Sequence, residues 1–404
     1  MQNASRGSLS SLSLSMLLAS LGTSIANVGL PSLARAFDAS FHAVQWVVLA
    51  YLLAITAVIV SAGRLGDRLG RRRLLLAGLC LFAAACGLCG MAPSLQWLVA
   101  ARILQGLGAA VMMAMAMGMV GDTVPRERTG RVMGLLGTMS AVGTAMGPGV
   151  GGMLLGTWGW RAIFLVGVPL GGLALVLAWR CLPVDRPHAL SSKGPNAWSS
   201  LKDASLRAGL AMSALVAAVI MATFVVGPFY LSHGLGLKPA WMGLTMAVGP
   251  CVAAVSGVPA GRLTDRLGNR RVTLAGLGVL ACGALLLSIA SGLLMYLGGL
   301  VILTCGYSLF QAANNTAVMS DVEGGRRGTV AGLLNLSRNL GLIFGTSALG
   351  AVFAWATPDV THATAQSVAH GMHLTFGVAL GLILLASAMA SGRITGLNAP
   401  QNIR

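Results

Sequence analysis

Long runs without a charged residue constrain this chain more than any other feature. Residues 272–320 contain no Asp, Glu, Lys, Arg or His over forty-nine positions, and residues 74–92 contain no charge over nineteen. An α-helix of about 20 apolar residues crosses the roughly 30 Å hydrocarbon core of a bilayer. The longer run therefore fits two crossings joined by a turn near Ser291 and Gly292. The sequence predicts a polytopic α-helical membrane protein.

The low charge content agrees with this prediction. Charged residues make up 9% of the 404 residues and hydrophobic residues 56%, with a mean hydropathy of +0.80, whereas a soluble domain carries about 25% charged residues. Placing spans between the charge clusters predicts twelve transmembrane helices, at residues 12–30, 44–62, 74–92, 95–120, 132–156, 161–181, 208–231, 240–260, 272–291, 293–320, 328–354 and 373–392.

The net charge of +17 has an uneven distribution along the chain. If both termini lie in the cytoplasm, 22 of the 27 Lys and Arg residues fall in cytoplasmic segments. Three fall outside (Arg35, Arg161 and Lys238) and two within spans (Arg102 and Arg338). This bias is the positive-inside rule. We therefore expect a multi-pass protein of the plasma membrane, in this case the inner membrane of a bacterium. We expect no nucleic-acid partner.

One phrase occurs twice. GRLGDRLGRRRLLLAG at residues 63–78 returns as GRLTDRLGNRRVTLAG at residues 261–276, with twelve of sixteen positions identical and an offset of 198. A second region keeps that offset, because Gly130, Val132, Gly134, Leu135, Leu136, Gly143 and Gly147 match Gly328, Val330, Gly332, Leu333, Leu334, Gly341 and Gly345. The chain is therefore predicted to be a duplicated six-helix unit.

The repeat divides the chain into two predicted domains. Residues 1–181 form an N-terminal six-helix bundle, residues 182–207 a cytoplasmic linker rich in Pro, Ser and charge, and residues 208–404 a C-terminal six-helix bundle. The linker is too short for a nucleotide-binding domain, and G-x-x-x-x-G-K-[ST] does not occur. We expect no cofactor. Parallel repeats of six spans are one of the known transporter plans.

Several motifs occur in order along the chain. They are QWVVLAYLL at 45–53, GRLGDRLGRR at 63–72, LVAARILQGLGA at 98–109, GTAMGPGVGG at 143–152 and WRAIF at 160–164. With them the chain resembles the major facilitator superfamily, and within it the drug:proton antiporters, over nearly its whole length. The resemblance implies an all-α fold of twelve transmembrane helices in two pseudo-symmetric six-helix bundles. It also implies a monomer that exports small amphipathic molecules, driven by the proton gradient, by alternating access around a midplane cavity.

The repeated phrase predicts a cytoplasmic gate in each half. Gly63 would let two helices approach closely. Asp67 would face the positive end of the helix that begins near Gly328, and Asp265 the helix that begins near Gly130, each contact worth about 0.3–1 kcal/mol. The alternative is that the arginines only set topology. The predicted gating residues are Gly63, Asp67, Arg68, Gly70, Arg71, Arg72, Arg131, Asp265 and Arg266.

Glycines predict a packed helix over residues 132–156. Gly143, Gly147 and Gly151 recur every four residues, and Pro148 removes a backbone hydrogen bond and can bend the helix. We expect this helix to form a bendable interface between the halves. A phosphate-binding loop is disfavoured, because the segment lies within a span and follows no strand. The predicted helix-packing residues are Gly143, Gly147, Pro148, Gly151 and Gly152.

Two arginines lie well inside predicted spans. A charge at the depth of Arg102 or Arg338 costs roughly 2.5–3.5 kcal/mol on insertion scales and indicates a functional site. The alternative is a structural arginine that binds backbone carbonyls or stacks within the bundle. Uncharged polar residues inside spans either line a cavity or hydrogen-bond neighbouring helices. The predicted substrate cavity comprises Asn27, Gln45, Tyr51, Arg102, Gln105, Asn335 and Arg338.

The chain departs from the antiporters in its first span. They often carry an Asp in a Leu-Asp-x-Thr-x-x-Asn-Val-x-Leu-Pro pattern, whereas Gly22 stands at that position here. All ten acidic residues fall at or beyond span ends. A buried cation needs an opposite charge, so we expect a neutral or anionic substrate. Asp122, with Asp38 behind it, is the predicted proton carrier, although Asp122 would equally pair with Arg131.

Other function classes remain as alternatives. Within transport, the rival is an uncoupled facilitator or metabolite exporter. Outside transport, it is a membrane-embedded sensor or binding protein. An enzyme is not expected, because the sequence shows no clustered nucleophile and base. A metal site is not expected either, although His370 and His373 stand three residues apart near His362.

Overall fold

The computed structural model describes residues 2–119, 129–183, 203–320, 327–357 and 363–396. Throughout these ranges the chain is helical, with short turns and no strand. Eleven of the described helices are long and apolar enough to cross a membrane, and the remaining predicted span, 132–156, lies within a helix of thirty residues. The predicted all-α membrane fold is confirmed.

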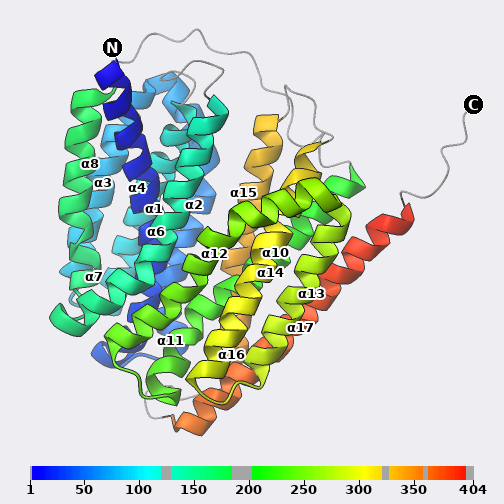
Figure 1. Ribbon diagram of the computed structural model, residues 1–404. Helices are drawn as coiled ribbons and strands as arrows, with labels where there is room; N and C mark the ends of the chain where they lie inside the picture. The colour runs from blue at the N-terminus through cyan, green and yellow to red at the C-terminus, as the bar shows by residue number, and fades with distance from the viewer. Residues whose placement is uncertain (1, 120–128, 184–202, 321–326, 358–362, 397–404) are drawn as a thin grey trace, which may run out of the picture. The chain divides into compact units, whose positions relative to one another are not determined.

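The helices of the first half run in chain order as follows (Figure 1). They are α1 (Gln2–Ala36), α2 (Phe41–Leu69), α3 (Arg71–Gly90), α4 (Leu95–Gly118), α6 (Thr129–Trp158), α7 (Ala162–Leu165) and α8 (Gly167–Cys181).

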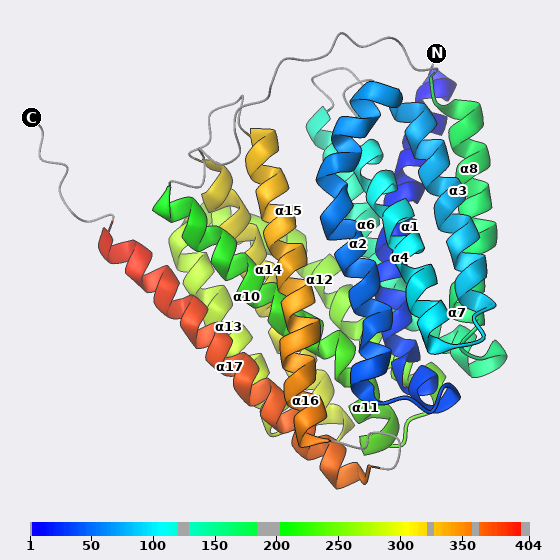
Figure 2. The same ribbon diagram turned by 180° about the vertical axis from the view of Figure 1, so that it is seen from behind.

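The second half follows the same order of long helices (Figure 2). Its elements are α10 (Ala204–Val225), α11 (Gly227–Phe229), the π-helical turn η2 (Tyr230–Gly234), α12 (Pro239–Leu267), α13 (Asn269–Ser288), α14 (Leu293–Ser320), α15 (Arg327–Phe344), the π-helical turn η4 (Gly345–Leu349), α16 (Gly350–Ala356) and α17 (Ala365–Gly396).

Three predicted spans are interrupted in the structure. The span 161–181 divides into α7 and α8 just before Pro169, and 208–231 breaks at α11, which contains Pro228. Proline cannot donate a backbone hydrogen bond, so both interruptions have a local cause. The span 328–354 passes through η4, a π-helical turn that hydropathy does not indicate.

Packing divides the chain into two compact units. Unit 1 comprises Met1–Ser192, Leu231–Pro250 and Asp359–His362, and the rest of the chain forms unit 2. Residues 231–250 contain the first part of α12, which the sequence repeat assigns to the second copy. The domain boundaries drawn from the sequence therefore stay a prediction.

The duplication is visible inside each unit. In unit 1, α3 and α4 cross where a Cβ added to Gly108 would meet the Gly78 carbonyl oxygen at 2.9 Å. In unit 2, α13 and α14 cross where a Cβ added to Gly306 would meet the Gly276 carbonyl oxygen at 2.8 Å. Gly276 and Gly306 lie 198 positions after Gly78 and Gly108, so the two copies share this close helix crossing.

Candidate functional site

Arg102 is the most deeply buried charged residue among those that the structure describes. It lies on α4 with none of its side chain exposed. Its Nε donates to the Val47 carbonyl of α2 at 2.8 Å, and its Nη1 donates to the Gly22 carbonyl of α1 at 3.1 Å and to Gln105 Oε1. Arg102 therefore ties three helices of unit 1 together. This arrangement matches the structural alternative that the sequence left open.

Not every donor of this guanidinium is used. Nη2 of Arg102 is buried and has no hydrogen-bond partner among the described residues. A buried cation with an unused donor carries a desolvation cost that carbonyl oxygens offset only in part. The Nη2 group of Arg102 therefore remains able to donate a hydrogen bond to a further partner.

An aromatic ring, that of Tyr51, lies against Arg102. The guanidinium carbon lies 4.1 Å from the centroid of the Tyr51 ring, a cation–π contact. The Tyr51 hydroxyl donates to the Ala19 carbonyl at 2.6 Å. A Cβ added to Gly22 would lie 2.8 Å from that hydroxyl oxygen. A side chain at position 22 would therefore meet the Tyr51 hydroxyl, which accounts for a glycine there.

Sequence reasoning missed two thiols in this cluster. Cys86 and Cys89 lie one turn apart on α3, both buried, and Gln105 Nε2 donates to Cys86 Sγ at 3.0 Å. The Gln105 side chain thereby connects Arg102 to α3. Spacing gives the signal, because residues three apart share a helix face, yet the sequence does not show that this face meets α4.

The second copy carries leucines at the positions of Arg102 and Gln105. At the offset of 198, Arg102 corresponds to Leu300 and Gln105 to Leu303, and both leucines are buried in α14. The second copy is therefore built without a charge at this position.

No described hydrogen bond joins the other predicted cavity residues to this cluster. Asn27 is buried and donates to the carbonyls of Thr23 and Ser24, while its Oδ1 has no partner among the described residues. Gln45 is also buried, and its Nε2 lacks a partner in the same described part of the chain. In unit 2, Asn335 is exposed and Arg338 half-buried on α15.

The arginines after Gly70 have structural partners. Gly70, with φ of 97°, ends α2 and begins α3. Arg71 Nη1 donates to the Gly118 carbonyl at the end of α4, and Arg72 Nη2 donates to the Trp179 carbonyl near the end of α8, each at 2.6 Å. Cations stabilise helix C-termini. Both side chains therefore bind helix ends.

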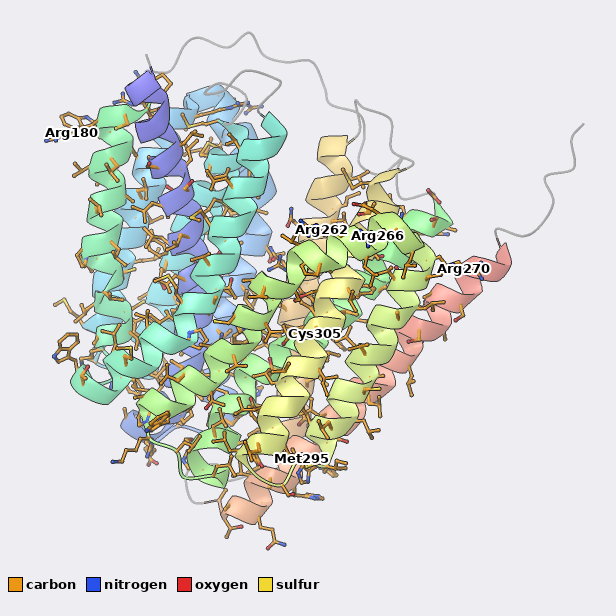
Figure 3. All side chains as sticks on the ribbon, viewed as in Figure 1. Arg180, Arg262, Arg266, Arg270, Met295 and Cys305 are labelled. Atoms are coloured by element: carbon orange, nitrogen blue, oxygen red, sulfur yellow. The ribbon has the colours of Figure 1, made fainter. Side chains whose placement is uncertain are left out.

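The gating residues are only partly described. Gly63 has no described atom within 4 Å of an added Cβ, so the predicted close approach lies one turn later, where a Cβ at Gly66 would meet the Met115 side chain at 2.5 Å. Arg68 is exposed, as are Asp265 and Arg266 near the α12–α13 turn, where Arg262 and Arg270 also lie (Figure 3). The side chains of Asp67 and Arg131 lie outside the described part.

The glycines of α6 lie against α1 within unit 1. A Cβ at Gly143 would overlap the Leu17 carbonyl oxygen, and one at Gly147 would overlap Ser24 Oγ. A Cβ at Gly151 would meet Val28 of the same helix. Gly143, Gly147 and Gly151 therefore pack α6 onto α1 and do not face the other half of the sequence.

The end of this motif contacts a different helix. A Cβ at Gly152 would lie 2.6 Å from the Gly243 Cα of α12, and one at Gly243 would overlap the Pro148 carbonyl oxygen. Both helices contribute these residues to unit 1. Of the proton-carrier candidates, Asp38 is exposed between α1 and α2 with φ of 46°, and Asp122 lies outside the described residues.

Duplicated helical units with a buried guanidinium define a membrane transporter of the two-bundle class. The chain belongs to the Major Facilitator Superfamily, whose family model matches residues 12–346. It is therefore a transporter and not an enzyme.

Three similar proteins illustrate the range of relatives. The riboflavin transporter RibZ of Clostridioides difficile is 28% identical, covering 83% of this chain and 86% of RibZ. The multidrug resistance protein Stp of Mycobacterium tuberculosis is 29% identical, covering 82% of this chain and 72% of Stp. A bacterial homologue of the human lysosomal transporter Spinster matches in structure with a TM-score of 0.83 at 18% identity, over 96% of this chain and 97% of that one.

Proposed function

We propose that this protein exports small amphipathic molecules, neutral or anionic, from a bacterial cytoplasm by alternating access, driven by the proton gradient. Both termini would lie in the cytoplasm and the working unit would be a monomer. Family membership supports transport, and the relatives include proteins named for riboflavin transport and for multidrug resistance.

One observation carries the proposed substrate class. The guanidinium of Arg102 is fully buried, and its described partners are carbonyl oxygens, one amide and the Tyr51 ring, with no carboxylate among them. A cationic substrate entering such a low-dielectric region would meet a like charge and no counter-ion. Neutral and anionic molecules do not meet this penalty.

A second candidate is an uncoupled exporter. No acidic residue lies between the ends of a predicted span, and the titratable candidates Asp38 and Asp122 lie at or beyond span ends. Without a carboxylate inside the membrane, fewer side chains are available to carry the coupled proton. A pH gradient distinguishes the two candidates, since only the coupled exporter accumulates substrate against its concentration gradient.

Purified protein in proteoliposomes tests this proposal. We expect riboflavin, a neutral amphipathic molecule, to be transported and to accumulate when a pH gradient is imposed, whereas ethidium, a cation, is not transported above protein-free vesicles. Counterflow of labelled substrate separates a transporter from a sensor, which only binds. Equal rates for ethidium and riboflavin would contradict the substrate class, and Asp122→Asn with unchanged accumulation would remove Asp122 as the proton carrier.

We also propose that the repeated phrase works as a cytoplasmic gate, in which Asp67 and Asp265 each face a helix N-terminus only while the cytoplasmic side is closed. Asp265 is exposed and has no described partner in its own unit, so it is available for such a contact. A carboxylate at a helix N-terminus contributes about 0.3–1 kcal/mol.

Neutralising one gate acid should therefore have a modest effect. We expect Asp265→Asn to reduce the transport rate about two- to fivefold, because it weakens the closed state by that energy. The matched control is Asp203→Asn, which removes an acid but keeps the N-cap on Ser205 that Asp203 Oδ1 forms at 2.8 Å. Equal effects of the two substitutions would argue against the gate.

A further inference from the structure

The packed side of α15 is well defined. Ser337 Oγ donates to the Leu210 carbonyl of α10 at 2.5 Å. One turn further on, a Cβ at Gly341 would overlap the Ala214 carbonyl oxygen of α10. These contacts fix how the helix is rotated in unit 2, and therefore which residues stand on its two free flanks.

The two flanks differ in polarity. At 3.6 residues per turn, Leu336, Leu340 and Phe344 share one flank, and the exposed fractions of Leu340 and Phe344 are 51% and 48%. Arg338 and Asn335 stand on the other flank, half-buried and exposed respectively. The apolar flank suits lipid, whereas the polar flank does not.

Arg338 lies well inside α15. It lies eleven residues after Arg327, where α15 begins, which is about 16 Å of helix rise. Its guanidinium forms no hydrogen bond or ion pair with any described residue. Exposing it to lipid would cost roughly 2.5–3.5 kcal/mol, a cost that is avoided where its flank borders a polar or hydrated space.

The neighbouring helix α14 presents polar residues at the same depth. Gln311 and Asn315 lie one turn apart on α14, half-buried and exposed respectively. Val318 of α14 and Val330 of α15 belong to one buried cluster. The two helices are consecutive spans and hence antiparallel. From this cluster Gln311 lies seven residues back along α14 and Arg338 eight residues on along α15, so the two are level to within one residue, and Asn315 lies within two residues of the level of Asn335.

The first copy lacks all of these polar groups except one small hydroxyl. At the offset of 198, Arg338 corresponds to Ser140, whose Oγ hydrogen-bonds Ser20 Oγ at 2.6 Å. The other equivalents of the unit 2 residues Gln311, Asn315 and Asn335 are Met113, Met117 and Gly137. The first copy is therefore built without a charge here, so the repeated fold does not by itself account for the polar flank of unit 2.

We propose that Arg338 binds the carboxylate of an amphipathic organic anion, with the amides of Gln311, Asn315 and Asn335 beside it. A guanidinium pairs with a carboxylate through two parallel N–H···O bonds, and no acidic residue lies inside a predicted span to compete for it. This inference rests on the proposed function, because it names the charged member of the substrate class.

A matched pair of dyes tests the inference by binding, without reliance on transport. Dansylglycine carries a carboxylate, and dansylglycinamide has the same body with a neutral amide. Fluorescence titration of the full chain in nanodiscs should show that Arg338→Gln weakens dansylglycine binding about ten- to hundredfold, the range for a hydrogen bond to a charged group. Binding of dansylglycinamide should stay unchanged, and Arg338→Lys should lose less.

The control is Arg270→Gln, which removes the same charge from an exposed position at the start of α13 (Figure 3). It should bind both dyes as the wild-type protein does. Equal losses for the two dyes, or none for dansylglycine, would overturn the carboxylate assignment and leave the proposed export of neutral molecules standing. Failure of the proposed export itself would appear separately, as absent counterflow of riboflavin in the wild-type protein.

Discussion

Replacing Arg102 by leucine is expected to reduce transport at least about a hundredfold while the protein stays folded. The side chain lost makes charge-assisted bonds to Val47 and Gly22, each worth about 1.5–3 kcal/mol. If those bonds and the unused Nη2 serve substrate transport, their loss removes the function. Leu300 is buried at the equivalent position of the second copy, so the repeated helix accommodates leucine there.

Stability is the measurement that separates function from folding. Leucine removes the cost of burying an unpaired charge, but it leaves the Val47 and Gly22 carbonyls without a donor, at about 1–3 kcal/mol per buried group. The thermal midpoint of Arg102→Leu should therefore fall moderately, while the unfolding transition stays cooperative. Arg102→Lys keeps the charge but loses the planar fork, and should retain part of the activity. Normal transport by Arg102→Leu would make the arginine structural.

Hydropathy predicts the helices well because the bilayer allows few structures. A span must satisfy its own backbone hydrogen bonds, so apolar runs such as 272–320 become helices. The same argument does not locate interruptions within a span. Pro169 and Pro228 could have indicated two of them, but η4 contains no proline and depends on packing against neighbouring helices.

The sequence predicts which residues belong to the candidate site but not which residues they contact. Arg102 stands out in sequence because a charge inside a span is rare, yet the sequence does not say whether it faces a cavity or other helices. The structure gives it the Tyr51 ring and two carbonyls. The reason that Gly22 lacks a side chain became apparent only from the place of the Tyr51 hydroxyl.

The glycine stripe illustrates the same limit. Spacing of four residues predicts a smooth helix face, but it does not identify the helix that packs there. In unit 1 that helix is α1, and in unit 2 the equivalent Gly341 packs against α10. A repeat can establish that two packings are equivalent without establishing which neighbours they involve.

Substituting alanine at the close-packed glycines should destabilise both copies of the unit. A Cβ at Gly143 or at Gly341 would overlap a backbone carbonyl oxygen of the facing helix, at Leu17 and Ala214 respectively. Backbone cannot rotate away as a flexible side chain can, so each substitution should push two helices apart. Overpacking of this kind costs about 1–3 kcal/mol or more, and should lower the thermal midpoint measured by size-exclusion chromatography after heating.

The same helices contain glycines at which substitution by alanine should have the opposite effect on stability. Gly137 of α6 and Gly332 of α15 have no described atom within 4 Å of an added Cβ. Alanine is about 0.8–1.0 kcal/mol more favourable than glycine inside a helix, so Gly137→Ala and Gly332→Ala should keep or raise the thermal midpoint. Because all four changes add one methyl group, a uniform response would show that helix propensity, and not the contact between helices, sets the outcome.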